Sequence, residues 1–300
     1  MNKYFKNSEK LLRIAESKIK NEIISYEEMI SATLFFGIGI ESLMKGIIYD
    51  VNPVYVYEVN SFSNAMAVVY KEKIKVNNIV KSHEQIKKTN ENVISFSKAF
   101  SRAEHLSKTT HDHKATICRL KDARDIIAHC PIDDFDLLKE DRLKNILNQF
   151  HILVSLYEKE LNLKFIESEV DESEATSHLL NIQTKIQERI AESKQIWNSK
   201  KDDANHIQGA NIQTMTMDAT HPDTDNSYLI ECPACSKEAV LFVNEDYAMD
   251  EHGNYFVENF YVQNLSCFFC NFRVIEAEEI DYMKLHEKER VIYQGSGQTQ

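Results

Sequence analysis

The sequence predicts a mainly α-helical protein that carries a small β domain near its C-terminal end. Glycine and proline are scarce, with 7 and 4 occurrences in 300 residues, which suits helices joined by few tight turns. Up to residue 201, apolar residues recur at three- and four-residue steps, the spacing that lines one face of a helix. Runs rich in aromatic and β-branched residues, typical of strands, follow after residue 228.

Composition and charge limit the kind of protein that this chain can be. Hydrophobic residues make up 43% of the chain, enough to bury a core, and 300 residues suit two domains of ~100–200 residues each. The formal net charge of −12 argues against a protein that coats nucleic acid through bulk electrostatics. A nucleic-acid site would therefore have to be a local basic patch.

We expect a soluble, cytoplasmic protein with no membrane association. The first twenty residues are charged throughout and lack the apolar segment of a signal peptide. The most apolar stretch, Met29–Met44, is interrupted by Glu41 and is shorter than the ~18–20 apolar residues of a membrane span. Four of the six cysteines form two Cys-x-x-Cys pairs, which in an intracellular chain indicate metal binding rather than disulfides.

The first 165 residues are predicted to form a helical domain around one central helix. The run Met29–Ile48 is apolar nearly all round, as in a helix enclosed by others. Its Glu41 and Lys45 have the spacing and order of a favourable helical ion pair. Weaker patterns predict helices over 54–75 and 90–109.

Two further helices complete the predicted domain. A helix over 113–129 places Ile117, Leu120 and Ile127 on its inner stripe, and it ends by Pro131 because the residue before a proline disfavours the helical conformation. One long amphipathic helix then carries the apolar residues Leu143, Ile146, Leu147, Phe150, Leu153 and Tyr157.

The remainder of the chain divides into an extension, a linker and the β domain. After the acidic break 167–174, a helical extension over 175–201 carries Leu179, Ile182, Ile186, Ile190 and Trp197 on one stripe. This helix either closes the helical domain or pairs with its copy in a dimer. Residues 202–227 are polar, without sustained periodicity, and are predicted to be a linker to the β domain at 228–287.

The β domain contains two pairs of cysteines with metal-ligand spacing. Cys232 and Cys235 are separated by two residues, as are Cys267 and Cys270, and 31 residues lie between the pairs. Two residues between cysteines allow a tight turn to direct both sulfurs at one ion. Strand-like runs at 239–243, 255–265 and 272–275 flank the turns.

These features predict a zinc ribbon. Four thiolates complete the tetrahedral coordination of a structural Zn²⁺, so no position remains for a catalytic water. Ser236 and Asn271 occupy the positions after each turn, where glycine is frequent; asparagine tolerates a positive φ, and serine does so less readily. The alternatives are a redox Cys-x-x-Cys and unpaired buried thiols, but a redox motif needs one such pair beside a βαβ unit.

A second candidate site lies in the helix before Pro131. Its residues 120–131 read LKDARDIIAHCP, which contains Arg124 and His129 as an R-x4-H string with Asp125 after the arginine. Together with the apolar helix that carries Glu41 and Lys45, this string resembles the HEPN family of small helical domains. That family typically has an R-x4–6-H motif late in the domain and a Glu-then-Lys pattern in an earlier apolar helix.

The resemblance implies a fold, an activity and partners. It implies a HEPN-like helical bundle over 1–165 that forms a homodimer and cleaves RNA, with Arg124, His129, Asp125 and Glu41 as its site residues. A HEPN domain followed by a helical extension and a four-cysteine ribbon is similar to toxin and anti-phage defence proteins, which implies an antitoxin or another defence protein as a partner. Some family members are non-catalytic and only bind RNA or protein, and a ribbon adaptor with a dimerising helical part is a further alternative.

The residues themselves support part of this interpretation. Arg124 lies on the flank of the predicted buried stripe, where its charge needs a partner such as Glu41, a second subunit or a phosphate. His129 points about 140° away on a straight helix, so one such helix does not bring both groups to one point. Fraying before Pro131 and the reach of the arginine side chain help, and a two-fold dimer that supplies two copies of each group helps more.

RNA carries its own nucleophile, the 2′-hydroxyl, so its cleavage requires a proton acceptor such as His129 and phosphate stabilisation by Arg124, but no metal. Glu41 or Asp125 would orient the arginine. The plain alternative is a structural ion pair at Arg124 and a histidine that faces the negative end of its helix.

Overall fold

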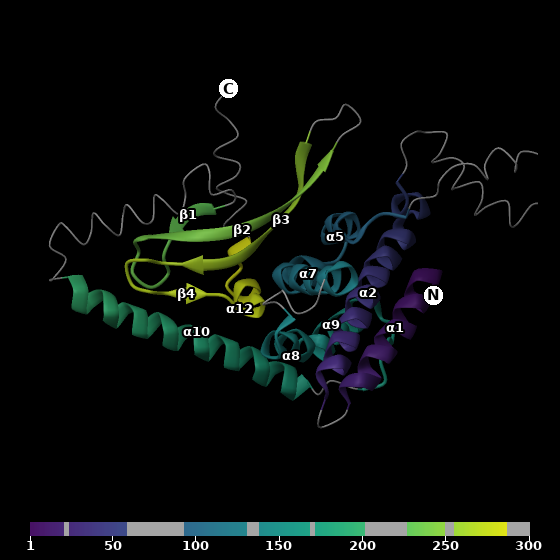
Figure 1. Cartoon of the computed structure of the whole chain (residues 1–300), viewed down its shortest axis with the longest axis horizontal. Helices are drawn as coiled ribbons and strands as arrows, with labels where there is room; N and C mark the ends of the chain where they lie inside the picture. Colours follow the sequence, from purple (N-terminus) through teal and green to yellow (C-terminus); the bar gives the residue numbers. More distant parts are fainter. Residues whose placement is uncertain are drawn as a thin grey trace, which may run out of the picture. The chain divides into compact units, whose positions relative to one another are not determined.

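A computed structural model of the chain is mainly helical with one small sheet near the C-terminal end, as predicted (Figure 1). It describes residues 1–20, 24–58, 93–130, 138–168, 172–201, 227–249 and 255–286, and every structural statement below concerns these residues. The chain divides into two compact units, each described by itself. Unit 1 comprises 1–111 and 120–169, and unit 2 comprises 112–119 and 170–300.

The regular elements of unit 1 that the structure describes are all helices, apart from an isolated β-bridge between Tyr57 and Val93. Its elements are α1 (Lys3–Ile19), α2 (Tyr26–Val51), the 3₁₀ turn η1 (Pro53–Val56), α5 (Phe96–Glu104), α6 (Lys108–Asp112), α8 (Glu140–Asn148) and α9 (Phe150–Leu161). The helix α7 (Lys114–His129) is shared, because its residues up to Arg119 group with unit 2 and the following ones with unit 1.

The predicted central helix is confirmed as α2. Ser25 caps it through a reciprocal pair of hydrogen bonds with Glu28, which satisfies the first N–H groups of the helix. By length and composition α2 could cross a membrane, but most of it is buried inside the protein, as expected for a core helix. Its Phe36 ring packs edge-on against Phe150 of α9, with 4.9 Å between ring centroids.

Glycines on α2 allow α1 to approach closely. A methyl group at Gly39 would lie 2.7 Å from Leu12 Cδ2, and one at Gly46 would overlap the ring of Phe5. The two glycines are seven residues apart, two helical turns, and therefore lie on the same face of α2. Figure 1 shows α1 and α2 side by side.

Several predicted helix bounds differ from the structure. The helix over 113–129 is confirmed as α7, with Ile117 and Leu120 buried but Ile127 only half-buried. The predicted helix 54–75 is wrong at its start, where η1 ends and Tyr57 forms a β-bridge with Val93; its residues after 58 lie outside the described ranges.

The predicted helix 90–109 is two helices. Ser95 accepts a hydrogen bond from the N–H of Lys98 and so starts α5 at Phe96. Ser107 likewise accepts one from Thr110, and this second cap starts α6.

The predicted long helix over 143–157 is also two helices. Helix α8 ends before Gln149, whose N–H bonds to the carbonyls of Ile146 and Leu147, and α9 begins at Phe150. All six apolar residues of the predicted stripe are buried, so the periodicity identified the inner face correctly.

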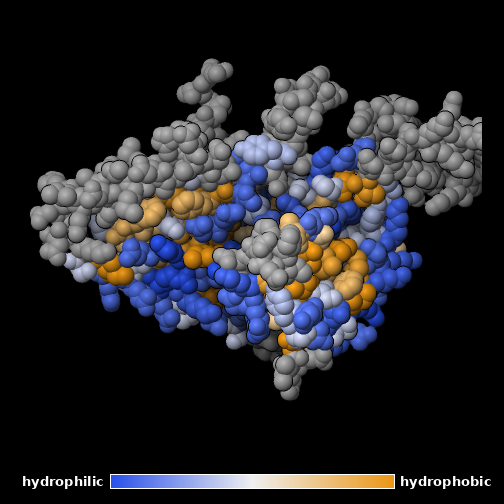
Figure 2. Space-filling view, viewed as in Figure 1, coloured by the Kyte–Doolittle hydropathy of each residue, from blue (hydrophilic) through white to orange (hydrophobic). Residues whose placement is uncertain are grey.

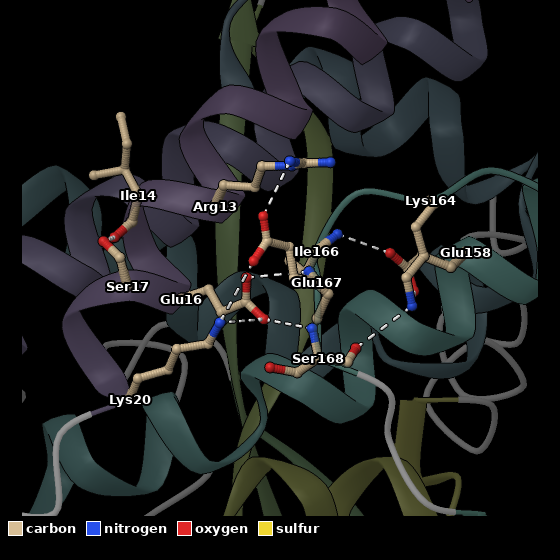
Figure 3. A network of polar contacts seen from close by, with 10 residues as sticks. All are labelled: Arg13, Ile14, Glu16, Ser17, Lys20, Glu158, Lys164, Ile166, Glu167 and Ser168. Carbon is tan, nitrogen blue, oxygen red and sulfur yellow. Dashed lines mark hydrogen bonds and ion pairs between the residues drawn. The ribbon is translucent and has the colours of Figure 1, made fainter.

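The end of unit 1 is held by two acidic side chains (Figure 3). Glu158 Oε1 accepts hydrogen bonds from the N–H groups of residues 165 and 166, at 2.5 and 2.9 Å. Glu16 accepts hydrogen bonds from the N–H groups of 167 and 168, at 3.2 and 2.8 Å. Lys20 lies 3.8 Å from the Glu16 carboxylate. Four consecutive backbone N–H groups of the segment that follows α9 are thus satisfied by two helical carboxylates.

In the residues of unit 2 that the structure describes lie the sheet and two helices, besides the start of α7. Its elements are α10 (Glu172–Lys201), β1 (Ser227–Glu231), β2 (Glu238–Met249), β3 (Tyr255–Ser266), β4 (Arg273–Val274) and α12 (Ala277–Tyr282). The strands pair in sequence order and all are antiparallel. The predicted runs 239–243, 255–265 and 272–275 correspond to β2, β3 and β4, whereas β1 was not predicted. The predicted linker 202–227 cannot be compared with the structure, because only its last residue, 227, is among the described residues.

The predicted extension is α10, and it packs within unit 2. Ile182 and Ile186 are buried, and the ring of Trp197 packs edge-on against Phe269, which lies between Cys267 and Cys270, with ring centroids 6.0 Å apart. Leu179, predicted on the same stripe, is 50% exposed, so the buried face of α10 begins one turn later than the periodicity suggested.

Candidate functional site

The two cysteine pairs occupy two turns of the same construction. One turn joins β1 to β2 and the other joins β3 to β4. The N–H of Cys232 bonds to the carbonyl of Lys237 at 2.8 Å, and the N–H of Cys267 bonds to that of Phe272 at 2.8 Å. Both hydrogen bonds span five residues and close the turn behind the sulfurs.

The residue after each cysteine pair has a left-handed backbone conformation, which suits positions where glycine is frequent in such turns. Ser236 has φ 57° and Asn271 has φ 60°. This conformation bends the chain sharply, and a non-glycine residue adopts it at some steric cost. The equal geometry at two positions 35 residues apart in the sequence indicates a repeated turn that serves one purpose.

The four sulfurs form a cluster of the size that a metal ion requires. All four lie within 4.8 Å of one another, with 3.6 Å between the sulfurs of Cys232 and Cys270 and 3.6 Å between those of Cys235 and Cys267. A tetrahedral ion with bonds of ~2.3 Å separates its ligands by ~3.8 Å. None of the four cysteines forms a disulfide. The cluster can therefore hold a metal ion.

Without a cation the thiols of Cys232, Cys235 and Cys270 would stay protonated. The hydrogen bond with Cys267 and then burial raise the pKa of Cys232 well above its usual range. Burial raises the pKa of Cys235 to about 12, and burial also raises the pKa of Cys270. A divalent cation reverses this preference, because it stabilises the thiolates that bind it. The site is closed, since all four positions of a tetrahedral ion would be filled by sulfur.

The second candidate site is an ion-pair cluster between α2 and α7 in unit 1. Arg124 Nη2 lies 2.5 Å from Glu41 Oε2, and Arg124 Nη1 lies 2.5 Å from Asp125 Oδ1. The other oxygen of Glu41 accepts a hydrogen bond from Lys45 Nζ at 2.5 Å. Glu41 thus bridges the two cations, and of the three partners considered for Arg124 it is the one that the structure shows.

Neighbouring residues fix the course of the Arg124 side chain. A methyl group at Gly37 would lie 2.7 Å from Arg124 Cβ and 2.9 Å from its Cγ, so only glycine leaves room for this stem against α2. The guanidinium carbon lies 5.9 Å from the centroid of the Phe96 ring, within the range of a cation–π contact. Two carboxylates, one ring and one glycine therefore determine where the guanidinium lies.

His129 is not brought to this cluster within one chain. It is the last residue of α7, and its side chain is exposed. Since α7 is helical from Lys114 to His129, the five steps from Arg124 correspond to about 140° around the axis and ~7.5 Å along it. The structure therefore combines Arg124, Asp125, Glu41 and Lys45, and leaves His129 apart.

The cluster is electrically balanced. Two cations, Arg124 and Lys45, face two carboxylates, Glu41 and Asp125. The side chain of Asp125 is 39% exposed and that of Glu41 is 11% exposed, so Asp125 is the partner that an incoming anion can displace more easily. A guanidinium has five N–H donors, and donors beyond the two in these pairs are available for a ligand.

The sequence did not identify Phe96 or Gly37 as parts of this cluster. A glycine inside an apolar helix does indicate close approach of another element, so Gly37 carried a usable signal. Phe96 carried none, because its contact depends on how α5 packs beside α7.

Comparisons of the chain with protein-family models, with curated proteins and with solved structures give no match. Function is therefore inferred from the residues and their geometry.

Proposed function

We propose that the protein is a metal-independent endoribonuclease of the HEPN type that acts as a toxin or in anti-phage defence. One observation carries this proposal: Arg124 of α7 is oriented by Glu41 of α2 and by Asp125, while His129 lies exposed at the end of the same helix. An oriented guanidinium and an accessible imidazole are the two groups that metal-free RNA cleavage requires.

The chemistry follows from the ribose. The His129 imidazole takes the proton of the 2′-hydroxyl, and the 2′-oxygen bonds to phosphorus. The bond from phosphorus to the 5′-oxygen breaks, and this oxygen takes up a proton from an imidazolium or water. Arg124 donates hydrogen bonds to the phosphate oxygens as charge develops on them. The products are a 2′,3′-cyclic phosphate and a 5′-hydroxyl.

A homodimer would unite the two groups. Because Arg124 and His129 point about 140° apart on one helix, a two-fold axis near the end of α7 would place Arg124 beside His129 of the partner subunit. Large apolar side chains are exposed in unit 1, among them Ile14, Val51 and Leu106, and Figure 2 shows separate hydrophobic patches on one face of the molecule. Such patches are where a second copy can bury area.

The four-cysteine cluster would bind Zn²⁺ as a structural ion, since thiolates in tetrahedral arrangement favour zinc among the common ions. The zinc would take no part in the reaction. A cytoplasmic location suits both the reduced thiols and an RNA substrate.

A second candidate function is a non-catalytic module that binds RNA or a protein such as an antitoxin. The charge balance at Arg124 favours it, because both terminal nitrogens of the guanidinium are already paired with carboxylates. The two candidates differ in that the ribonuclease cleaves RNA, whereas the binding module binds its partner without cleaving it.

Purified full-length protein incubated with total cellular RNA distinguishes them. The ribonuclease should cleave, and R124A and H129A should each reduce the rate by about 10²-fold or more. R13A and H105A serve as matched controls on exposed residues of unit 1 and should retain the rate. Absence of cleavage by the wild-type protein, with RNA binding that R124A weakens, would support the binding module instead.

A further inference from the structure

The first turn of α7 is capped by a residue from the other end of the chain. Asp281 of α12 accepts hydrogen bonds from the N–H of Ala115 at 2.8 Å and from the N–H of Thr116 at 3.0 Å. The Thr116 hydroxyl donates a third, at 2.7 Å. A side chain that bonds the first N–H groups of a helix acts as its N-cap, a role usually filled by a residue just before the helix. All these residues belong to unit 2.

A second contact joins the same two elements. Arg119 of α7 donates a hydrogen bond to the carbonyl of Ile275 at 2.6 Å, and it lies 3.4 Å from the carboxylate of Glu276. The residues of α7 that group with unit 2 are therefore held at both ends by the segment that leads into α12.

The other acids of α12 hold α10. Glu279 forms a two-pronged ion pair with Arg189, at 2.7 and 2.8 Å, and Arg189 also donates to the carbonyl of Arg273 in β4. Glu278 lies 3.3 Å from His178. The four acids from Glu276 to Asp281 thus divide between two helices, two acids to each. We name this arrangement the α12 clasp.

The clasp depends on the fold of the cysteine cluster. Only five residues separate Cys270 from Glu276, and β4 lies among them. Ile280 and Leu285 are buried in the same hydrophobic core as Cys232, Cys267 and Cys270, and Cys235 packs against this core. Ala115 of α7 belongs to the core too. A small ribbon derives much of its folding free energy from its metal. Loss of the metal would therefore release α12 and its carboxylates.

Asp281 is costly to leave without its donors. Its side chain is buried, and a buried carboxylate that loses its hydrogen bonds is strongly destabilised. The Asp281 carboxylate and the first turn of α7 are therefore expected to become ordered together.

We infer that Asp281 is a positioning residue for α7, which fixes the start of the helix that carries Arg124 and His129 while the metal-bound ribbon holds α12 in place. The ribbon thereby acts on the proposed ribonuclease site without contributing a group to it. The inference rests on the proposed function only for this last consequence, because the cap itself can be measured without any activity.

Hydrogen–deuterium exchange of residues 114–119 in zinc-loaded, full-length protein tests the inference. D281A should raise exchange of the Ala115 and Thr116 amides roughly fivefold or more, the factor that loss of a helix N-cap typically gives, with zinc still bound. E278Q is the matched control, because it removes an α12 carboxylate that faces α10 and should leave these amides unchanged. Removal of zinc from the wild type by a chelator should raise the exchange rate of the same two amides. In D281A, where these amides already exchange fast, chelation should raise the rate little further.

RNA cleavage is measured on the same samples and should fall in D281A but not in E278Q. If the wild type cleaves no RNA and the exchange pattern still appears, the proposed function fails and the role of Asp281 stands. If D281A loses its zinc, the variant T116V is used in its place. T116V removes the hydroxyl that donates to Asp281 and leaves α12 intact, and faster exchange of the Ala115 and Thr116 amides is again expected. Unchanged exchange in a zinc-loaded variant would overturn the inference.

Discussion

At the scale of single residues, the contacts of Arg124 determine how its guanidinium can bind a ligand. Its two terminal nitrogens contact carboxylates of unequal exposure, and its stem passes over a glycine. In the proposed mechanism, a phosphate would reach the guanidinium by displacing Asp125, while Glu41 would keep the side chain in place. Glu41 would then be the main orienting partner and Asp125 the exchangeable one.

The missing side chain at Gly37 provides a test of Arg124 positioning. G37A would place a methyl group 2.7 Å from Arg124 Cβ, an atom that cannot move without its backbone. We expect a loss of about 1–3 kcal/mol in the free energy of unfolding, as for other overpacked cores, and a fall in RNA cleavage. Urea denaturation and a cleavage assay measure the two effects.

G39A is the control for this prediction. It lies on the same helix, but its methyl group would meet Leu12 of α1 instead of Arg124. It should lower stability and leave the cleavage rate per folded molecule nearly unchanged. Equal losses of cleavage in both variants would contradict the proposed positioning role of Gly37.

The pairing of Arg124 with Glu41 was predictable for a physical reason. An arginine on the flank of a buried stripe needs an acid, and Glu41 is the acidic residue within the apolar helix 29–48. The role of Phe96 was not predictable, because neither its neighbours in the sequence nor its periodicity reports which helix packs beside it.

At the scale of elements, apolar periodicity located inner faces better than it located ends. Gln149 keeps right-handed helical dihedrals, with φ −81° and ψ −10°, so the apolar pattern continues across the break between α8 and α9. The strand β1 has five residues, too few for an alternating pattern to stand out. The acids of α12 gave no signal, because their partners lie 80 or more residues away in the sequence.

The contact of Glu16 with the end of unit 1 predicts a pH dependence. Burial raises the pKa of Glu16, but the hydrogen bonds from Ser168 and Glu167 and the charge of Lys20 outweigh it, so the pKa lies below its ordinary value. A carboxylate with a lowered pKa stabilises the fold above its unfolded pKa of ~4.3, and this contribution is lost as the pH falls through the folded value. Wild type should therefore exceed E16Q in stability at pH 7.

The measurement is the midpoint of urea denaturation of both proteins between pH 3 and 7. The difference between them should shrink below about pH 4, where Glu16 takes up its proton in the folded state as well. E9Q changes a half-buried acid on the same helix, which pairs with Arg13 instead of the end of unit 1, and its stability should follow that of the wild type across this pH range. A difference between wild type and E16Q that is constant with pH would show that ionisation of Glu16 is not involved.

At the scale of the whole molecule, the helical and β parts predicted from the sequence are both present, and the two compact units do not divide the chain into two continuous stretches. Helix α7 contributes residues to both compact units, and α10 packs with the ribbon. Contacts between residues far apart in the sequence decide this division, and local patterns carry no information about them.

Metal removal should affect unit 2 selectively. Purified protein should contain about one zinc per chain, and C232S or C267S should lose it, because three thiolates hold the ion more weakly than four. Hydrogen–deuterium exchange should rise across β1–β4. It should also rise along α10, because Trp197 packs against Phe269 in the second cysteine turn, while the amides of α1 and α2 should stay protected. C118S is the matched control. Elemental analysis that finds no zinc, or strands that stay protected after chelation, would remove this prediction.

The most direct test of the central claim is the chemistry of the cleaved RNA. Zinc-loaded protein is incubated with a defined RNA that it cuts, and with the same RNA carrying one 2′-deoxy nucleotide at the cleavage position, in the absence of free divalent metal. We predict a 2′,3′-cyclic phosphate and a 5′-hydroxyl from the first, and an intact second substrate, since attack by the 2′-hydroxyl is the bond-forming step. Cleavage of the 2′-deoxy substrate at the same position, or cleavage that appears only when Mg²⁺ is added, would contradict the account.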